Sequence, residues 1–301
     1  MRQIIRVTLF CLAVSALLLA ADYQFVRIHV PKSIWTEAHG INARGDIVGT
    51  YTDADDIRHG FLLHKGEFTT IDVPGAAVTW AARGINARGD IVGNFDDAEG
   101  TAIHGYLLSN GQFTQIDYPG ASGTVVERIN NAGDITGNWF DALGNLGGFI
   151  RKDGKFHNVS IPGGFFESVR AAQDNGRVLV GTYSDDGGGV RYHGFIRRKP
   201  GEFEQIDYPG LSVPCTGVRY IDQRGVMVGG FARIDADEPC HPPFRENHGF
   251  LLRDGEFTLI DFPESPATEP MCINDDGVIV GRYTDRNGRL HGFKAVPSDS
   301  Q

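Results

Sequence analysis

Six copies of one sequence repeat make up most of the chain. Each copy contains variants of Gly-Ile-Asn-x-x-Gly-Asp-Ile-Val-Gly-x-Tyr, then of His-Gly-Phe-Leu-Leu, then of Gly-x-Phe-Thr-x-Ile-Asp-x-Pro-Gly. One turn glycine marks each copy, and successive marker glycines are 44, 44, 43, 49 and 52 residues apart. The marker glycines are Gly45, Gly89, Gly133, Gly176, Gly225 and Gly277. A period of this length, with several short apolar runs in each copy, predicts a β-propeller or a similar array.

The first copy predicts four short strands separated by turns. The predicted strands are the approach to Ile41, then 46–51, 60–63 and 68–73, which are rich in β-branched and aromatic residues. Asn42 and Gly45 open and close a type I turn, and Pro74 ends the fourth strand because proline cannot donate to a strand pair. No segment shows helical periodicity, so the sequence predicts an all-β class.

The two ends of the chain predict a closed ring. The sixth copy lacks its fourth strand, whereas residues 23–31 carry the same Phe-x-x-Ile-x-Val-Pro spacing as residues 68–74. We therefore predict one six-bladed β-propeller over residues 22–296, with four strands per blade, closed by an N-terminal strand at 23–31. Residues 297–301 are predicted to be a disordered tail. The alternative is an open β-solenoid, which has no need of a strand at the far end.

The N-terminus predicts export. Residues 1–21 have Arg2 and Arg6 before or beside an apolar run, then small residues suited to cleavage. The run is short for a membrane span, and an uncleaved anchor is the alternative. We expect a secreted protein, extracellular or periplasmic, and a monomer. The net charge of −10, or −12 without Arg2 and Arg6, argues against nucleic acid and anionic membranes as partners.

Three cysteines lie outside the predicted signal: Cys215, Cys240 and Cys272. In a four-stranded meander, the link between blades and the link from second to third strand lie on the same face. Cys215 lies in a link between two blades, and Cys240 lies in the link from the second to the third strand of the blade that follows it. We predict a Cys215–Cys240 disulfide, with Cys272 a buried free thiol; a Cys240–Cys272 bridge is the alternative.

Several polar residues recur in most copies and are predicted to serve the scaffold. A catalytic pair is needed once, so recurring His/Asp pairs such as His59 and Asp53 are expected to tie strands together. An Asn/Asp series opens the marker turns at Asn42, Asn86, Asn130, Asp174, Asp222 and Asn274. Acidic loops at 53–56, 96–97 and 184–186 offer oxygen ligands for Ca²⁺ but lack a complete calcium-loop spacing. No metal site is therefore predicted, with Ca²⁺ the one candidate cofactor.

The repeat resembles a described family, although no known catalytic motif is present. His-Gly-Phe-Leu, preceded by Gly-Ile-Asn-x-x-Gly-x-Ile-Val-Gly, resembles the probable extracellular repeats of the HAF family over residues 35–296. This resemblance implies export and a propeller-like array, and it implies no reaction and no catalytic residue. Gly147 and Arg233 depart from the pattern in copies three and five.

A binding site is expected where the copies differ, in the links on one face of the ring. These links contain aromatic side chains that suit a sugar or peptide, glutamates, and arginines that suit an anion. The candidate residues are Trp35, Glu37, Trp80, Glu127, Arg128, Phe165, Phe166, Glu167, Arg170, Arg219 and Glu269.

Two functions remain open from the sequence. The first is a secreted binding or scaffold module whose partner is an extracellular glycan, peptide or protein. The second is a hydrolase or lyase centred on the channel, with or without a divalent metal. The enzyme hypothesis requires the carboxylates of Glu37, Glu127, Glu167 and Glu269 to converge near the axis with shifted pKa values.

Overall fold

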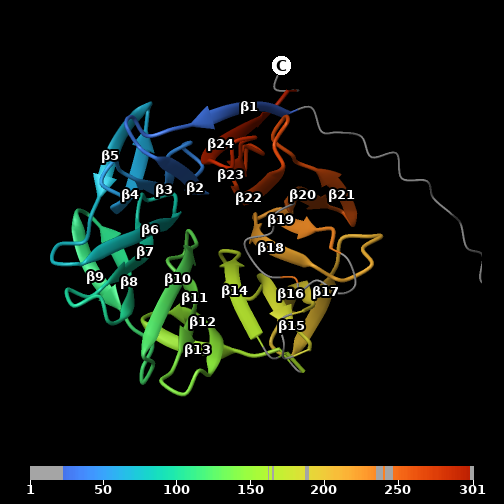
Figure 1. Ribbon diagram of the computed structural model, residues 1–301. Coiled ribbons are helices and arrows are strands. Elements are labelled where there is room, and N and C mark those ends of the chain that lie inside the picture. Colours follow the sequence, from blue (N-terminus) through green and yellow to red (C-terminus); the bar gives the residue numbers. More distant parts are fainter. Residues whose placement is uncertain are drawn as a thin grey trace, which may run out of the picture.

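The computed structural model describes residues 23–161, 163–164, 166–186, 190–234, 240 and 247–298, with the backbone alone at 166 and 167. The described chain forms six antiparallel sheets of four strands each. Figure 1 shows the sheets as blades around a central axis, with the first strand of each innermost. The fold is a six-bladed β-propeller, as the repeat predicts. Among the described residues, no helix is long and apolar enough to cross a membrane.

Blades one to three follow the first three copies of the repeat. Blade one contains β2 (Trp35–Ile41), β3 (Ile47–Thr52), β4 (Arg58–His64) and β5 (Glu67–Ile71). Blade two contains β6 (Val78–Ile85), β7 (Ile91–Asp96), β8 (Ile103–Ser109) and β9 (Gln112–Ile116). Blade three contains β10 (Gly123–Ile129), β11 (Ile135–Phe140), β12 (Leu146–Lys152) and β13 (Lys155–Val159).

Blades four to six follow the last three copies. Blade four contains β14 (Phe166–Ala172), β15 (Leu179–Ser184), β16 (Tyr192–Lys199) and β17 (Glu202–Ile206). Blade five contains β18 (Thr216–Ile221), β19 (Met227–Ala232), β20 (Asn247–Arg253) and β21 (Glu256–Leu259). Blade six contains β22 (Ala267–Ile273), β23 (Ile279–Thr284), β24 (Leu290–Pro297) and, from the other end of the chain, β1 (Tyr23–Ile28).

The N-terminal strand closes the ring, which confirms the closure predicted from the sequence. β1 pairs antiparallel with β24, from Tyr23 opposite Pro297 to Ile28 opposite Gly292. Phe25 of β1 packs edge-on against Phe262, with ring centroids 5.5 Å apart. The predicted signal (1–21) lies outside the described residues. β24 itself reaches Pro297, so only residues 299–301 of the predicted tail lie outside them.

Two parts of the repeat pack on each other in every blade. In blade one, a Cβ atom on Gly49 would stand 2.6 Å from the ring of Phe61, which is fully buried. The glycine therefore lets the aromatic ring lie flat against the second strand. The same contact recurs in the pairs Gly93–Tyr106, Gly137–Phe149, Gly181–Phe195, Gly229–Phe250 and Gly281–Phe293. This packing explains why Ile-Val-Gly and His-Gly-Phe recur together.

The residues that open the marker turns also tie neighbouring blades together. Asn42 Nδ2 donates to the backbone carbonyl of Asn86 at 3.2 Å, and Asn274 Nδ2 donates to the carbonyl of Asn42 at 3.3 Å. In blade four the assignment of Asp174 to this position was wrong by one residue. Gln173 opens that turn, since its carbonyl accepts from the Gly176 amide and its Nε2 donates to the Asp222 carbonyl at 2.7 Å.

Recurring threonines, which sequence reasoning missed, tie the blades on the opposite face. Thr79 Oγ1 accepts the backbone N–H of Val73 at 2.9 Å, and Thr216 Oγ1 accepts that of Tyr208 at 3.0 Å. Thr36, Thr124 and Thr268 do the same in their blades. Each bond joins the segment just after the outer strand of one blade to the inner strand of the next.

The recurring histidines lie on the third strands and tie them to the fourth strands. His59 Nδ1 lies 2.9 Å from Asp72 Oδ1, and its Nε2 lies 3.3 Å from Asp53. His104, His193 and His248 contact Asp117, Asp207 and Asp261 in the same way. Blade three has lost both partners, with Gly147 and Ser160 in their places, and the indole of Trp139 covers Gly147. This geometry agrees with the scaffold role expected from the repetition.

The acidic loops form self-capped turns. Asp53 Oδ1 accepts the backbone N–H groups of Asp55 and Ile57, each at 2.9 Å. Asp97 Oδ1 likewise accepts the N–H of Thr101 at 2.6 Å. Within the described residues, no three His, Cys, Asp or Glu side chains are grouped so that they could hold a metal ion.

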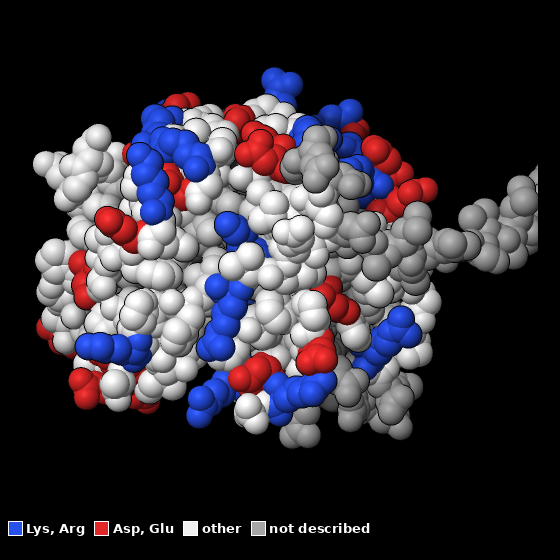
Figure 2. All heavy atoms as spheres, turned by 90° about the horizontal axis from the view of Figure 1, so that it is seen from above, with Lys and Arg blue, Asp and Glu red and all other residues white. Residues whose placement is uncertain are grey.

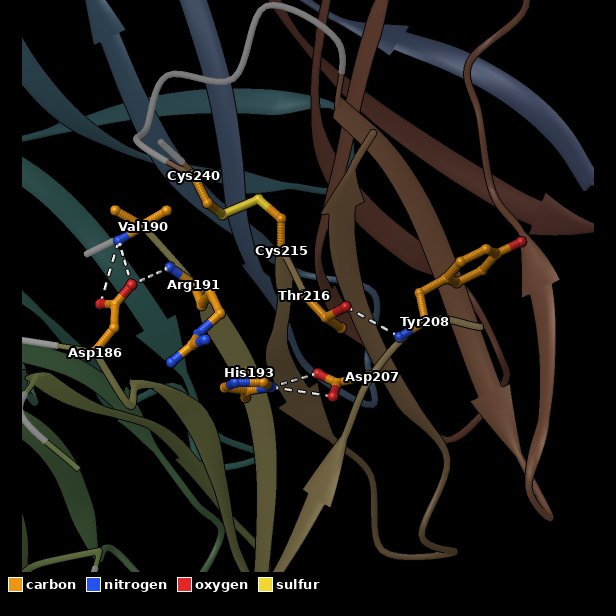
Figure 3. The surroundings of a disulfide bond; sticks show 9 residues. All are labelled: Asp186, Val190, Arg191, His193, Asp207, Tyr208, Cys215, Thr216 and Cys240. Atoms are coloured by element: carbon orange, nitrogen blue, oxygen red, sulfur yellow. Dashed lines mark hydrogen bonds and ion pairs between the residues drawn. A yellow bond between two sulfur atoms is a disulfide. The ribbon is translucent and has the colours of Figure 1, made fainter. Parts of the chain in front are cut away.

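One disulfide joins Cys215 and Cys240, whose Cα atoms are 5.7 Å apart, and Cys272 is a buried free thiol. This is the pairing predicted from the positions of the two links. Figure 3 shows the disulfide beside Thr216, at the start of β18. Most of the insertion between Ile234 and Asn247 lies outside the described residues.

Candidate functional site: an arginine-rich cavity at the channel mouth

A β-bulge recurs in the innermost strand of every blade and provides the wall of the channel. The register shifts by one residue between Ala38 and Gly40 in β2, and at the matching place in the other five first strands. Bulges locally disrupt a strand pair and re-aim a side chain. The six bulge residues are His39, Arg83, Glu127, Arg170, Arg219 and Met271.

Five of the six bulge residues, all except Glu127, line a central cavity of about 420 Å³. The cavity lies at the face of the ring that carries the variable links. Its other lining residues come from the first three strands of several blades. They are Trp35, Glu37, Thr50, Arg58, Trp80, Ala81, Asn94, Ile103, Val125, Glu269 and Arg282.

Each buried glutamate near the cavity is paired with arginine. Arg170 Nη1 donates to Glu127 Oε1 at 2.5 Å, and Arg83 Nη1 lies 3.5 Å from Glu127 Oε2. Glu269 is held by Arg282 at 2.6 Å and also by Arg219.

Arg282 links two of these glutamates, because it also contacts Glu37 at 2.9 Å. The ion pairs therefore form two sets, one that joins blades five, six and one and one that joins blades two, three and four. Glu37 and Glu269 belong to the first set and Glu127 to the second.

The charge balance of the cavity is positive. Its lining contains the arginines Arg58, Arg83, Arg170, Arg219 and Arg282 but only the glutamates Glu37 and Glu269. Five positive and two negative groups leave three positive charges among the lining residues, and two when Glu127, which pairs with Arg83 and Arg170, is counted, in a chain whose net charge is −10. Figure 2 shows, by contrast, acidic and basic side chains interspersed on the side of the ring that it displays.

The pKa values follow from burial and from these arginines. Burial raises the pKa of Glu127, but Arg170, Arg83, Arg128 and Arg219 outweigh this effect and lower it to about 2. Arg219 and Arg282 likewise hold the pKa of Glu269 below its usual value despite burial. Burial and the neighbouring arginines hold the pKa of His39 well below 6.5, so its imidazole is neutral at neutral pH.

The two tryptophans at the cavity are already in contact with a cation. The guanidinium carbon of Arg58 lies 5.2 Å from the ring centroid of Trp35 and 4.6 Å from that of Trp80. Arg58 therefore occupies ring surface that was expected to be open to a sugar or peptide, and it adds a cation to the rim of the cavity.

Arg128 was expected among the site residues, but it does not line the cavity. It lies on the inner strand of blade three and is buried. Its guanidinium donates to the carbonyls of Glu127 at 2.7 Å, His39 at 3.1 Å and Met271 at 2.8 Å. Arg128 therefore reaches across the axis and bonds three blades, which is a role in the scaffold.

The structure brings most of the other predicted residues together. Trp35, Glu37, Trp80, Arg170, Arg219 and Glu269 line the cavity, and Glu127 contacts its wall. Phe165 lies outside the described residues. Phe166 and Glu167 begin β14, but their side chains lie outside the described part of the chain, so the convergence of Glu167 remains a prediction.

Sequence reasoning missed several residues of the cavity, including His39, Arg58, Arg83 and Arg282. Aligning the six copies on the marker glycine gives a signal that could have found two of them. His39 and Arg83 each stand six residues before a marker glycine, as do Arg170 and Arg219.

A second, smaller cavity of about 210 Å³ adjoins the central cavity, and we call it the side cavity. The two share the lining residues Arg170, Arg219 and Glu269. The rest of the side cavity is lined by Thr182, Tyr192, Cys215, Thr216, Gly217, Gly230, Cys240 and Asn247.

Comparison with known proteins adds the fold alone. No family model matches the chain, and no curated protein does. Among solved structures, a gluconolactonase from Xanthomonas campestris is 11% identical, with 92% of this chain and 96% of that chain covered and a TM-score of 0.52. AofleA from Arthrobotrys oligospora is 11% identical, with 91% and 86% covered and a TM-score of 0.54.

A subtype N10 neuraminidase-like protein of A/little yellow-shouldered bat/Guatemala/060/2010 is 7% identical. The alignment covers 91% of this chain and 98% of that chain, with a TM-score of 0.51. At such low identity these likenesses concern architecture, and a propeller carries many chemistries. Function must therefore be argued from the cavity itself.

Proposed function

We propose that this protein is an exported binding module that takes an acidic carbohydrate into the central cavity. The single observation that carries the proposal is the excess of three positive charges among the cavity residues. Guanidinium groups form paired hydrogen bonds with carboxylate, and they do so most strongly where water is excluded. Export is supported by the Cys215–Cys240 disulfide, because such bonds persist in oxidising compartments.

The shape of the site favours a saccharide over a peptide strand. The site is a partly open cavity at the channel mouth and not a groove along a sheet edge, where extended peptides bind. Trp80 Nε1 and His39 Nδ1, both of residues that line the cavity, have no hydrogen-bond partner and place neutral hydrogen-bonding groups beside the arginines. Such groups suit the hydroxyls of a sugar that also carries a carboxylate.

Titration calorimetry with trigalacturonate tests the proposal, with maltotriose as the neutral saccharide and an oligo-aspartate peptide as the acidic non-saccharide. We expect trigalacturonate to bind and maltotriose not to bind. Arg219→Gln should weaken binding at least about tenfold, which corresponds to about 1.4 kcal/mol. Arg286→Gln is the matched control, because Arg286 is 73% exposed and does not line the cavity.

Two results would overturn the proposal. One is a preference for the peptide over the saccharide. The other is an equal loss of binding in Arg219→Gln and Arg286→Gln, which would mean that overall charge and not the cavity attracts the anion. Unfolding midpoints of both variants without saccharide show whether each is folded.

His39 supports a second candidate function, a lyase acting on the same saccharide. Its neutral imidazole lines the cavity with Nε2 3.2 Å from Thr50 Oγ1, while Nδ1 has no hydrogen-bond partner. A neutral base beside arginines that hold a carboxylate is suited to removing the proton from the carbon next to that carboxylate. The electron pair of the C–H bond then forms a C=C bond as the glycosidic C–O bond on the next carbon breaks, and the leaving oxygen takes a proton from water. If so, trigalacturonate should develop the ultraviolet absorbance of an unsaturated product, and His39→Gln should abolish it while binding persists. Binding without this absorbance would exclude the lyase.

A further inference from the structure

The pairing of the inner strands explains why the side cavity exists. In every blade, a residue of the first strand pairs with a residue of the second strand at the same position of the repeat. The pairs are Glu37–Thr50, Ala81–Asn94, Val125–Asn138, Ser168–Thr182, Gly217–Gly230 and Glu269–Arg282. In blade five, and in no other of these six pairs, both residues are glycine. The missing side chains leave the space that forms the side cavity.

The size of the side cavity suits a single ring. Its volume is about 210 Å³, and an engineered cavity of about 150 Å³ in another protein takes up a benzene-sized molecule. The side cavity adjoins the central cavity, and Arg170, Arg219 and Glu269 line both of them. A group in the side cavity can therefore be part of the same molecule as an anion held by these arginines.

Two neutral side-chain atoms in the wall of the side cavity, Thr182 Oγ1 and Asn247 Oδ1, are buried without a hydrogen-bond partner. In the wall that it shares with the central cavity, Arg170 Nε, Arg219 Nε and Glu269 Oε1 are also buried without one. Thr182 and Asn247 are only 8% and 7% exposed. Buried polar groups are almost always paired, because an unpaired one costs roughly 1–3 kcal/mol. The Asn247 amide oxygen accepts a hydrogen bond, and the Thr182 hydroxyl can donate or accept one, so both suit a hydroxyl group of a ligand, which does both.

The remaining wall is weakly polar. It includes the Cys215–Cys240 disulfide, the side chain of Tyr192 and the backbone of Gly217 and Gly230. Figure 3 shows the disulfide between Cys240 and Cys215, which precedes Thr216 at the start of β18. A sugar ring combines the two properties that this wall requires, since it has an apolar C–H face and hydroxyl groups at its edge.

We infer that the side cavity is a subsite for the hydroxyl-bearing edge of a second sugar unit, adjacent to the unit whose carboxylate Arg170 and Arg219 hold. The inference rests on the proposed function and narrows it. The ligand class becomes an acidic oligosaccharide of at least two units, and affinity depends on the second unit.

The variant Gly230→Thr tests this inference by filling the side cavity. A Cβ atom on Gly230 would meet its nearest neighbours, the His248 carbonyl and the Asn247 amide, at 3.4 and 3.5 Å, which are ordinary contacts. Threonine already occupies the equivalent position in blades one and four, at Thr50 and Thr182. Gly217 is less suitable, because its Cβ would stand 3.0 Å from Thr182 Oγ1.

The measurement is the ratio of the affinities for trigalacturonate and galacturonate, by calorimetry. In the unaltered protein we expect the trimer to bind at least about tenfold more tightly than the monomer. Gly230→Thr should abolish most of this gain and leave the affinity for the monomer within about twofold. The smaller variant Gly230→Ala should give an intermediate ratio, and it serves if threonine prevents folding.

The outcomes separate the two proposals. An unchanged ratio in Gly230→Thr, with binding still lost in Arg219→Gln, overturns the subsite and leaves the anion site intact. A trimer that binds no better than the monomer in the unaltered protein also overturns the subsite. If neither galacturonate nor its trimer binds, the proposed function itself fails, and the subsite fails with it.

Discussion

Glu127 gives the clearest pH dependence at the scale of single residues. Its folded-state pKa of about 2 lies below the ordinary glutamate value of 4.5, so its ionised form stabilises the folded state. This contribution is present above about pH 4.5 and is lost as the pH falls towards 2. A shift of this size corresponds to roughly 3 kcal/mol.

We predict that the free energy of unfolding falls less steeply in Glu127→Gln than in the unaltered protein as the pH is lowered from 4.5 towards 2, the range between the ordinary and the folded-state pKa of Glu127. Urea unfolding at several pH values measures both curves. Two curves that stay parallel over this range would show that Arg170 and Arg83 do not hold Glu127 in its ionised form. Glu264→Gln is the control, since Glu264 is 73% exposed.

Single residues also show how much of the site could be predicted from the sequence. Glu37, Arg170, Arg219 and Glu269 could be predicted, because the copies differ in these links while the scaffold stays the same. Arg83 was missed, because a bulge moves a side chain to the other face of the strand without leaving a trace in the strand period. Its position six residues before Gly89, which matches the positions of Arg170 and Arg219 in their copies, is the one sequence signal for it. The contact of Arg58 with both tryptophans could not be predicted, since it depends on how two blades pack.

At the scale of elements, β1 determines whether blade six is complete. It covers the outer edge of β24 over six residue pairs, from Tyr23 to Ile28, and brings Phe25 against Phe262 and Phe293. Without β1, the backbone groups of β24 are left unpaired, and an exposed edge strand promotes association between chains.

We therefore predict that a variant beginning at Lys32 unfolds at a lower temperature and forms oligomers, whereas a variant beginning at Tyr23 retains β1 and shows neither effect. Phe25→Ala should lower the free energy of unfolding by a few kcal/mol without opening the edge. Thermal unfolding and light scattering measure the two effects. A truncated variant that remains monomeric with an unchanged midpoint would show that β1 does not close the ring.

At the scale of the whole molecule, the sequence was sufficient for the architecture. The spacing of the marker glycines and the displaced fourth strand predict six blades and their closure, because each copy is one supersecondary unit that only its neighbours can bury. The arrangement of charge around the axis, in contrast, could not be predicted from the sequence. Arg282 meets Glu37 from the far end of the chain, at a sequence separation of 245 residues. Only the closed ring brings such residues together.

The bulge in each inner strand has a further consequence for how such a ring acquires new ligands. The bulged residue stands outside the one-to-one pairing of its strand, so its identity is not constrained by the partner strand. Duplication thus supplies six equivalent positions around one axis, each open to independent substitution. The chain uses them for histidine, glutamate, methionine and three arginines. A different set of six would give the same ring another specificity, through a few point mutations and without a new fold.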